Sequence, residues 1–137
     1  MDAITSTADI LLVEDDDAEA ELFARMALSR EPECTVTRVS SGRQELDQLE
    51  RHPLPDCIVL DLRLPGEDGI WVLEQLLGNA GWRTIPVIVF SGDLSRLGPA
   101  SSQYPNVASS VRKPHTLEEY EATLLIVCAI VGATVSR

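Results

Sequence analysis

The sequence predicts an α/β fold in which a parallel sheet is covered by helices on both faces. Five short apolar runs alternate with longer amphipathic segments, which is the pattern of repeated βα units. Several of these runs end on polar side chains, as strands do that deliver functional groups to one edge of a sheet. The length of 137 residues corresponds to one domain, with an expected core over residues 9–131 and a tail over 132–137.

The apolar runs give the five expected strands. They cover residues 9–14, 34–39, 56–61, 86–91 and 106–111, the last being weaker and rich in serine. Apolar residues follow one another directly in the first, third and fourth runs instead of alternating with polar ones. This pattern is typical of parallel strands that are buried on both faces.

The amphipathic segments give the helices. Asp17 is expected to cap a helix that continues through Leu28, and a second helix is expected from Ser41-Gly42 to about residue 50. A third follows the turn at 64–69, with Asp68 as its cap, and Thr116 begins the last as part of a capping box. Glycine and prolines within residues 94–105 predict that the fourth helix is short or irregular.

Composition excludes several classes of protein. Twenty-two acidic residues against eleven basic ones give a net charge of −11, which disfavours binding to nucleic acid or to an anionic membrane surface. The uncharged stretch at 122–136 is too short for a transmembrane helix, and the acidic N-terminus lacks the features of a secretory signal. Three distant cysteines without a C-x-x-C motif predict reduced thiols and a cytoplasmic location.

Charged and polar side chains follow four of the five expected strands. The first strand ends in Glu14 and Asp15, the third in Asp61 and the fourth in Ser91, and Lys113 follows the fifth. Ligands of open parallel sheets bind outside the carboxyl ends of the strands, so these residues are expected to meet at one edge.

Such a group supports phosphoryl transfer. Clustered carboxylates repel one another unless a cation lies among them, and Mg²⁺ prefers oxygen ligands. A carboxylate beside Mg²⁺ can act as the nucleophile that forms an aspartyl-phosphate, while an ammonium and a hydroxyl hold the phosphoryl oxygens. Lys113 is the only lysine among the eleven basic residues, and an ammonium is more compact than a guanidinium.

Four motifs at these strand ends resemble a response regulator receiver domain. They are ILLVEDD at 10–16, DCIVLDLRLPGEDG at 56–69, IPVIVFS at 85–91 and RKP at 112–114. Their order and separations match the family, and the resemblance extends from Asp9 to about Val131. It implies a flavodoxin-like, doubly wound sheet of five parallel strands in the order 2-1-3-4-5.

The resemblance also implies the role of each site residue. Asp61 would accept a phosphoryl group from a sensor histidine kinase or a histidine phosphotransfer protein. Mg²⁺ would be held by Glu14, Asp15, Asp61 and the backbone carbonyl of Arg63, and the phosphoryl oxygens by Ser91 and Lys113. The chain would then be a stand-alone response regulator and not an enzyme. It would signal through a protein contact or relay phosphate to another protein.

Three features depart from the usual pattern of the family. The Gly-Ala dipeptide that commonly follows the fourth helix is missing, and Tyr104-Pro-Asn106 occupies the region. Ser110 stands three residues before Lys113, where members often have an aromatic switch residue, so a hydroxyl-to-aromatic relay is not expected. Arg63 follows Asp61 by two residues, and Asp93 follows Ser91 by two. An ion pair between Arg63 and Asp93 is expected over the site, where it would slow the attack of water on the acyl-phosphate.

Three alternatives remain open from the residues. The acids at 14–17 would also stabilise the positive end of a following helix without any further function. A Mg²⁺-dependent phosphohydrolase with an aspartyl nucleophile usually has a second acid two residues after it, where this chain has Arg63. A docking module of the same fold would not need the acids and Lys113 together.

The C-terminal segment is unusually apolar for a surface helix. Between Glu121 and Arg137 there is no charged residue, although a helix that covers a sheet should keep a polar outer stripe. The segment is either a tightly buried helix, a strand-like tail or the interface of a homodimer. The dimer is preferred, and the layout also resembles receivers associated with bacterial phytochromes that dimerise through a C-terminal arm.

Overall fold

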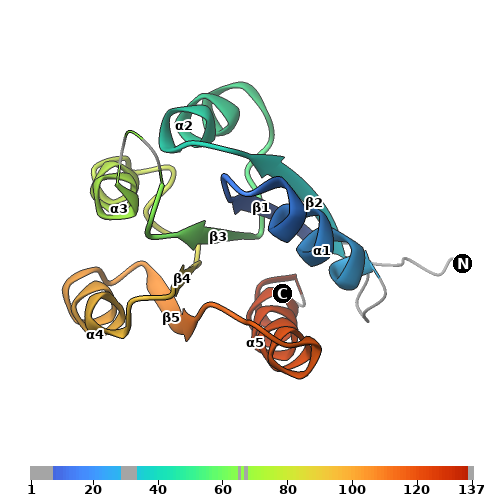
Figure 1. Ribbon diagram of the computed structural model, residues 1–137. Coiled ribbons are helices and arrows are strands. Elements are labelled where there is room, and N and C mark those ends of the chain that lie inside the picture. The colour runs from blue at the N-terminus through green and yellow to red at the C-terminus, as the bar shows by residue number, and fades with distance from the viewer. Residues whose placement is uncertain (1–7, 29–33, 65, 67, 136–137) are drawn as a thin grey trace, which may run out of the picture.

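The fold is a single parallel sheet between two layers of helices (Figure 1). The computed structural model describes residues 8–28, 34–64, 66 and 68–135. The five strands are β1 (Ala8–Val13), β2 (Cys34–Val39), β3 (Cys57–Asp61), β4 (Val87–Ser91) and β5 (Val107–Arg112). They lie in the order β2-β1-β3-β4-β5, and every neighbouring pair is parallel, as the sequence predicts.

Five helices connect and cover the strands. They are α1 (Asp17–Leu28), α2 (Gly42–Arg51), α3 (Gly69–Leu77), α4 (Leu94–Gln103) and α5 (Leu117–Val135). Helices α1 and α5 cover one face of the sheet, and α2, α3 and α4 cover the other (Figure 1). The acidic N-terminus at 1–7, two positions of the expected turn at 64–69 and the end of the tail at 136–137 lie outside the described residues.

Burial explains why the apolar residues are consecutive in the central strands. Along β1, Ile10 and Leu12 face the layer of α1 and α5, while Leu11 and Val13 face the layer of α2, α3 and α4. Every residue of β3 and β4 is buried, whereas β5 at the edge of the sheet is largely half-buried. The serine-rich strand β5, which had the weakest apolar pattern in the sequence, is therefore also less buried than the central strands, and it does not require apolar side chains on both faces.

Helix caps fix where the chain leaves the edge of the sheet. Asp68 Oδ1 accepts from Ile70 N at 2.9 Å, and Thr116 Oγ1 accepts from Glu119 N at 3.1 Å, so both expected caps are confirmed. Asp16 and Asp17 were both expected to cap α1. Asp16 does so, since its Oδ1 accepts from Glu19 N at 2.9 Å, whereas Asp17 is the first residue of the helix.

Contacts with other elements hold α4 against the sheet. Helix α4 is continuous over ten residues and as long as α2, so it is not short. The expected irregularity is limited to Pro99, which lies inside the helix and cannot donate a backbone hydrogen bond. Arg96 Nη2 contacts both carboxylate oxygens of Asp68 at 2.6 and 2.7 Å. Ser110 Oγ donates to the Leu97 carbonyl at 3.2 Å. The hydroxyl at the position of the usual aromatic switch thus fastens α4 to β5.

Gly69 lets α3 start close to the end of β3. A Cβ atom built at this position would lie 2.6 Å from Leu62 Cα and 2.9 Å from the Asp61 carbonyl oxygen. Because both are backbone atoms, neither can rotate away. The glycine therefore keeps the β3–α3 turn tight directly beside Asp61.

Helix α5 leaves an apolar stripe on its outer side. Tyr120, Leu124, Val127 and Val131 are buried against the sheet, while Leu125 and Ile126 are 61% and 38% exposed. The segment is helical through Val135, so it is neither a strand-like tail nor a fully buried helix. Among the described helices, none combines the length and apolarity needed to cross a bilayer.

Candidate functional site

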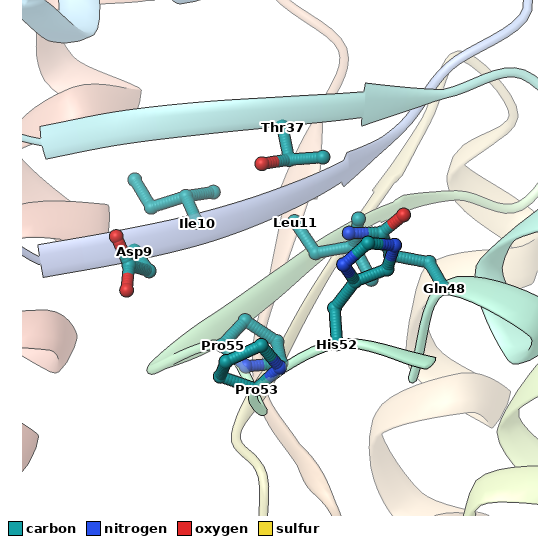
Figure 2. A pocket seen from close by; sticks show the side chains of 8 residues that line it. All are labelled: Asp9, Ile10, Leu11, Thr37, Gln48, His52, Pro53 and Pro55. Carbon is teal, nitrogen blue, oxygen red and sulfur yellow. The ribbon is translucent and has the colours of Figure 1, made fainter. Parts of the chain in front are cut away.

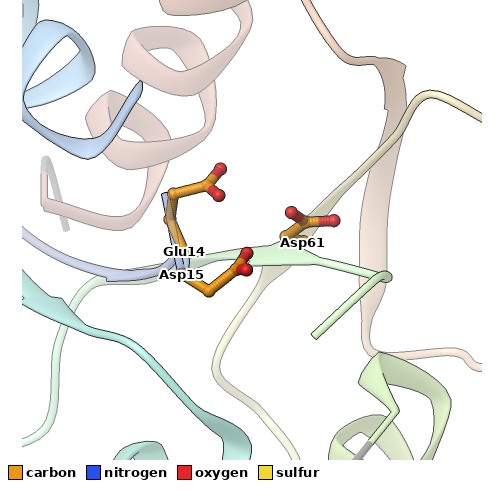
Figure 3. Close-up of side chains that lie close together, drawn as sticks. All are labelled: Glu14, Asp15 and Asp61. Carbon is orange, nitrogen blue, oxygen red and sulfur yellow. The ribbon is translucent and has the colours of Figure 1, made fainter. Parts of the chain in front are cut away.

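Three carboxylates meet where β1 and β3 end. Glu14 and Asp15 follow β1, and Asp61 is the last residue of β3, which pairs directly with β1. One carboxylate oxygen from each of the three lies within 4.8 Å of the others. Glu14 and Asp15 extend from the end of β1 toward the Asp61 side chain (Figure 3). Glu14 and Asp61 are buried, whereas Asp15 is exposed and leaves the cluster open to solvent.

Lys113 brings a positive charge to this cluster from the end of β5. Its Nζ atom lies 2.9 Å from Asp61 Oδ2 and 3.0 Å from Glu14 Oε1. Its backbone N–H donates to the Ser91 carbonyl at 3.0 Å, which ties the end of β5 to that of β4. The strand ends therefore assemble the acids and the lysine at one edge, as the sequence predicts.

The site has three carboxylates and one ammonium group, so its charges are not balanced. Burial raises the pKa of Glu14 to about 7, and the charge of Asp61 acts in the same direction although Lys113 opposes both. Burial by itself would lower the pKa of Lys113, but its hydrogen bonds and charge interactions with Asp61 and Glu14 outweigh burial and raise that pKa. The site thus keeps its lysine charged and still has excess negative charge.

Hydrogen bonds orient both oxygens of Asp61. Oδ1 accepts from the backbone N–H of Arg63 at 2.8 Å, and Oδ2 accepts from Lys113 Nζ. The first bond closes the turn that follows β3, so the backbone of Arg63 lies beside the carboxylate while its side chain is exposed. The carboxyl group is therefore held in one orientation at the mouth of the site.

Ser91 lies at the end of the neighbouring strand. Phe90 pairs with Asp61 in the sheet register, so Ser91 follows the residue opposite the carboxylate. Ser91 is fully buried, and its Oγ atom accepts from the backbone N–H of Asp93 at 3.0 Å. The hydroxyl is therefore fixed near the edge of the sheet by the turn that leads into α4.

The expected ion pair between Arg63 and Asp93 does not form among the described residues. Instead, the Asp93 carboxylate caps α4 by accepting from the backbone N–H of Ser95 at 3.0 Å and from its hydroxyl at 2.6 Å. These hydrogen bonds are the main reason that the pKa of Asp93 is lowered, and the charge of Arg63 contributes less. The cap forms in preference to the ion pair with Arg63, because both donors of the cap belong to Ser95, which is close in the chain and held in place by the helix.

Glu19 is a part of the site that the sequence analysis missed. Its Oε2 atom lies 3.3 Å from Lys113 Nζ, and its side chain is partly exposed. It stands in the first turn of α1, within the acidic run that follows β1. The acidic run was the only feature of the sequence that could have pointed to Glu19. It did not single out Glu19, because any acid near a helix N-terminus stabilises the helix.

A separate pocket lies at the other end of β1 (Figure 2). It has a volume of about 240 Å³ and is lined by Asp9, Ile10, Leu11, Thr37, Gln48, His52, Pro53 and Pro55. None of the residues of the acidic cluster contributes to it. The chemistry at the carboxyl ends of the strands therefore does not involve this pocket.

Known proteins share the sequence pattern of this chain. The model of the response regulator receiver domain matches residues 10–122. A probable methanogenesis regulatory protein, FilR2 of Methanothrix harundinacea, is 33% identical over 120 residues, which are 84% of this chain and 77% of the relative. Other relatives are longer: the chain spans 49% of the transcriptional regulatory protein KdpE of Mycobacterium tuberculosis, to which it is 33% identical.

Solved structures share the architecture. The phosphorylated cyanobacterial phytochrome response regulator RcpA superposes with a TM-score of 0.82 at 24% identity, over 94% of this chain and 96% of RcpA. The Mn²⁺-bound response regulator Rcp1 superposes with a TM-score of 0.76 at 25% identity, over 89% and 92% of the two chains. The family match, the strand order and the acids beside Lys113 agree, and the chain belongs to the response regulator receiver domain family.

Proposed function

We propose that this receiver domain accepts a phosphoryl group on Asp61 in a reaction that requires Mg²⁺. The observation that carries the proposal is the contact of Lys113 with Asp61 and Glu14 in a cluster of three acids. The family supports it as well, since receiver domains act in two-component signalling and interact with sensor histidine kinases. The donor would be such a kinase or a histidine phosphotransfer protein.

The residues present fit a magnesium ion. Mg²⁺ would be held by the carboxylates of Glu14, Asp15 and Asp61 and by the backbone carbonyl of Arg63, all of which are oxygen donors. The excess negative charge of the cluster favours a divalent cation, and receiver domains bind Mg²⁺ or Mn²⁺ at such a cluster. When bound, the ion neutralises charge on the transferred phosphoryl group and on the attacking carboxylate.

Each side chain of the site has a distinct part in the transfer. A carboxylate oxygen of Asp61 attacks phosphorus and forms the acyl-phosphate bond, while the bond from phosphorus to the donor's imidazole nitrogen breaks. The ammonium of Lys113 contacts one phosphoryl oxygen, and the hydroxyl of Ser91 donates to another. Ser91 Oγ accepts from Asp93 N in the present arrangement, and its O–H can still donate, because a hydroxyl accepts and donates at the same time.

Ser91 connects the site to α4. Ser91 Oγ and the Asp93 cap both lie in the turn where α4 begins, and α4 is fastened to β5 by Ser110. Phosphorylation would therefore shift an existing equilibrium in how α4 docks on the sheet. A protein partner would read this change. The net charge of −11 favours a protein over nucleic acid as that partner.

Acetyl phosphate provides the direct test of this function. Incubation of the chain with acetyl phosphate and Mg²⁺ is expected to add the mass of one phosphoryl group, measured on the intact protein. The Asp61→Asn variant is expected to gain nothing, because an amide is not a nucleophile toward phosphorus. Asp56→Asn is the matched control, since this half-buried acid precedes β3 at the opposite edge of the sheet and should leave the mass gain unchanged. A gain in Asp61→Asn equal to that of the wild type would disprove the assignment.

We also propose that the outer stripe of α5 mediates a homodimer. Leu125 and Ile126 are exposed on a stretch without charged residues, and burial of such a surface is favourable by about 25 cal/mol per Å². Leu125→Glu is expected to shift the protein from dimer to monomer in sedimentation velocity at tens of micromolar. Leu28→Glu is the control, because Leu28 is comparably exposed but ends α1. A wild-type protein that sediments as a monomer would remove the proposal.

A further inference from the structure

Two cysteines that lie far apart in the sequence are neighbours in the fold. Cys34 begins the edge strand β2, and Cys128 lies on α5, the helix that packs over the same face of the sheet. Cys128 packs against the buried cluster that contains Cys34, and a hydrogen bond between the two side chains contributes to the raised pKa of Cys34. Both side chains belong to the layer formed by the sheet with α1 and α5, and both are thiols in this structure.

The two sulfur atoms differ in their access to solvent. Cys34 is 1% exposed and is enclosed by the core, whereas Cys128 is half-buried at the side of α5. An oxidant in solution therefore reaches Cys128 first. Cys57, the third cysteine, is fully buried on β3, and its sulfur donates to the Ile58 carbonyl at 3.7 Å.

We propose that Cys34 and Cys128 form a reversible intramolecular disulfide when the protein meets a peroxide, and that this bond locks α5 onto β2. A disulfide requires sulfur atoms that can approach to about 2.05 Å with the Cβ atoms on facing sides. This pair already makes the side-chain contact from which that approach starts. The site rests on the packing of α5 against the sheet and does not depend on phosphorylation.

The chemistry proceeds in two balanced steps. The Cys128 thiolate attacks hydrogen peroxide, forming Cys128 sulfenic acid and releasing hydroxide. The Cys34 sulfur then attacks the sulfenic sulfur, and its proton leaves with the hydroxyl group as water. Two thiols are oxidised to one disulfide, and one peroxide is reduced to two waters. Burial and the neighbouring Cys128 raise the pKa of Cys34 to about 11, which makes Cys34 a poor first target and suits it to the second step.

Closing this bond would restrict the helix that carries the apolar stripe. The cross-link joins the edge strand on one side of the sheet to the middle of α5, so it removes freedom from the unfolded chain over most of its length. The oxidised protein should therefore unfold at a higher urea concentration than the reduced protein. It should also hold α5 in one position relative to β2.

The test is oxidation of the full chain with hydrogen peroxide, followed by alkylation of remaining thiols and peptide mapping without reductant. The expected product is a Cys34–Cys128 cross-link within a single chain that dithiothreitol removes, while Cys57 is alkylated only after unfolding. Cys128→Ser is expected to abolish the cross-link, and Cys57→Ser, the matched control, to leave it intact. Because wild-type protein alone gives the map, the result stands even if Cys128→Ser folds poorly.

Three outcomes would overturn the proposal. The first is a cross-link that involves Cys57. The second is a Cys128–Cys128 bond between two chains, seen as a dimer on a non-reducing gel. The third is a Cys128 that stays as sulfenic or sulfinic acid, trapped by dimedone, without any bond to Cys34.

Discussion

Lys113→Ala is expected to lower the rate of phosphorylation of Asp61 by acetyl phosphate by about 100-fold or more. Loss of one preorganised donor to a developing oxyanion typically has an effect of this size. Lys113 Nζ is the described cation nearest to both Asp61 and Glu14, at 2.9 and 3.0 Å, so no neighbouring group replaces it. The rate is measured from the time course of mass gain at saturating Mg²⁺.

The same substitution should also weaken the fold. Removing one partner of a buried ion pair costs roughly 3–5 kcal/mol, because the remaining charge stays buried without compensation. Lys113→Ala leaves Glu14 and Asp61 in this condition. We expect the free energy of unfolding in urea to fall by about 3 kcal/mol without metal, and to recover in part when Mg²⁺ is added.

Lys113→Arg separates the two effects. A guanidinium keeps the positive charge, so most of the stability should remain, but its planar fork cannot take the place of a compact ammonium beside the phosphoryl group. We therefore expect near-normal unfolding and slow phosphorylation. If Lys113→Ala is phosphorylated as fast as the wild type, the role given to this lysine is wrong.

The second large effect is expected at Glu45, on the face of α2 that packs against the sheet. Glu45 is fully buried, and neither of its carboxylate oxygens has a hydrogen-bond partner among the described residues. Burial raises the pKa of this carboxyl from 4.5 to about 8. The folded protein therefore keeps a proton on Glu45 at pH values where the unfolded chain has released it.

This difference makes stability depend on pH in a defined direction. The contribution of Glu45 to the free energy of unfolding should be highest below about pH 4.5. This contribution should fall as the pH rises toward about 8. Each unit of difference in pKa is worth about 1.4 kcal/mol, so the total loss is on the order of 5 kcal/mol. Above pH 8, Glu45 contributes no further change.

Glu45→Leu tests this directly. The variant should be more stable than the wild type by about 3 kcal/mol at pH 8, with a smaller gain at pH 5, measured as urea unfolding across that range. Glu45→Gln should flatten the pH dependence while keeping the shape of the side chain. Glu50→Gln is the control on the same helix, and because Glu50 is exposed its effect should stay within about 0.5 kcal/mol. Equal pH dependence in wild type and Glu45→Gln would contradict the prediction.

The position of Glu45 was not predictable from the sequence. Leu46 and Leu49 mark the apolar side of α2, but a helix can rotate slightly about its axis and bury either neighbour of that stripe. In the structure, Glu45 and Leu49 are buried and Leu46 is half-buried. Only the packing of α2 on the sheet decides this rotation.

The ion pair expected between Arg63 and Asp93 failed for a related reason. Sequence spacing correctly placed both residues just beyond strand ends. It could not show whether the Asp93 carboxylate would bind Arg63 or the nearby Ser95. Asp93 has two donors in Ser95 that its own helix holds in place. A local cap needs little ordering of the chain, whereas a pair between two loops must fix the long side chain of Arg63.

The sequence pattern by itself determined the parallel sheet and the residues at its carboxyl edge, because buried parallel strands require consecutive apolar residues and the chain leaves each strand at the same edge. The strand order came from the resemblance of four motifs to the receiver family. Asp61, Glu14, Asp15 and Lys113 were found in this way. The tertiary structure alone decided which side chains touch across layers, such as Glu19 with Lys113 and Cys34 with Cys128. Those contacts depend on helix rotation and on the fit of α1 and α5 against the sheet, and neither leaves a periodic signal in the sequence.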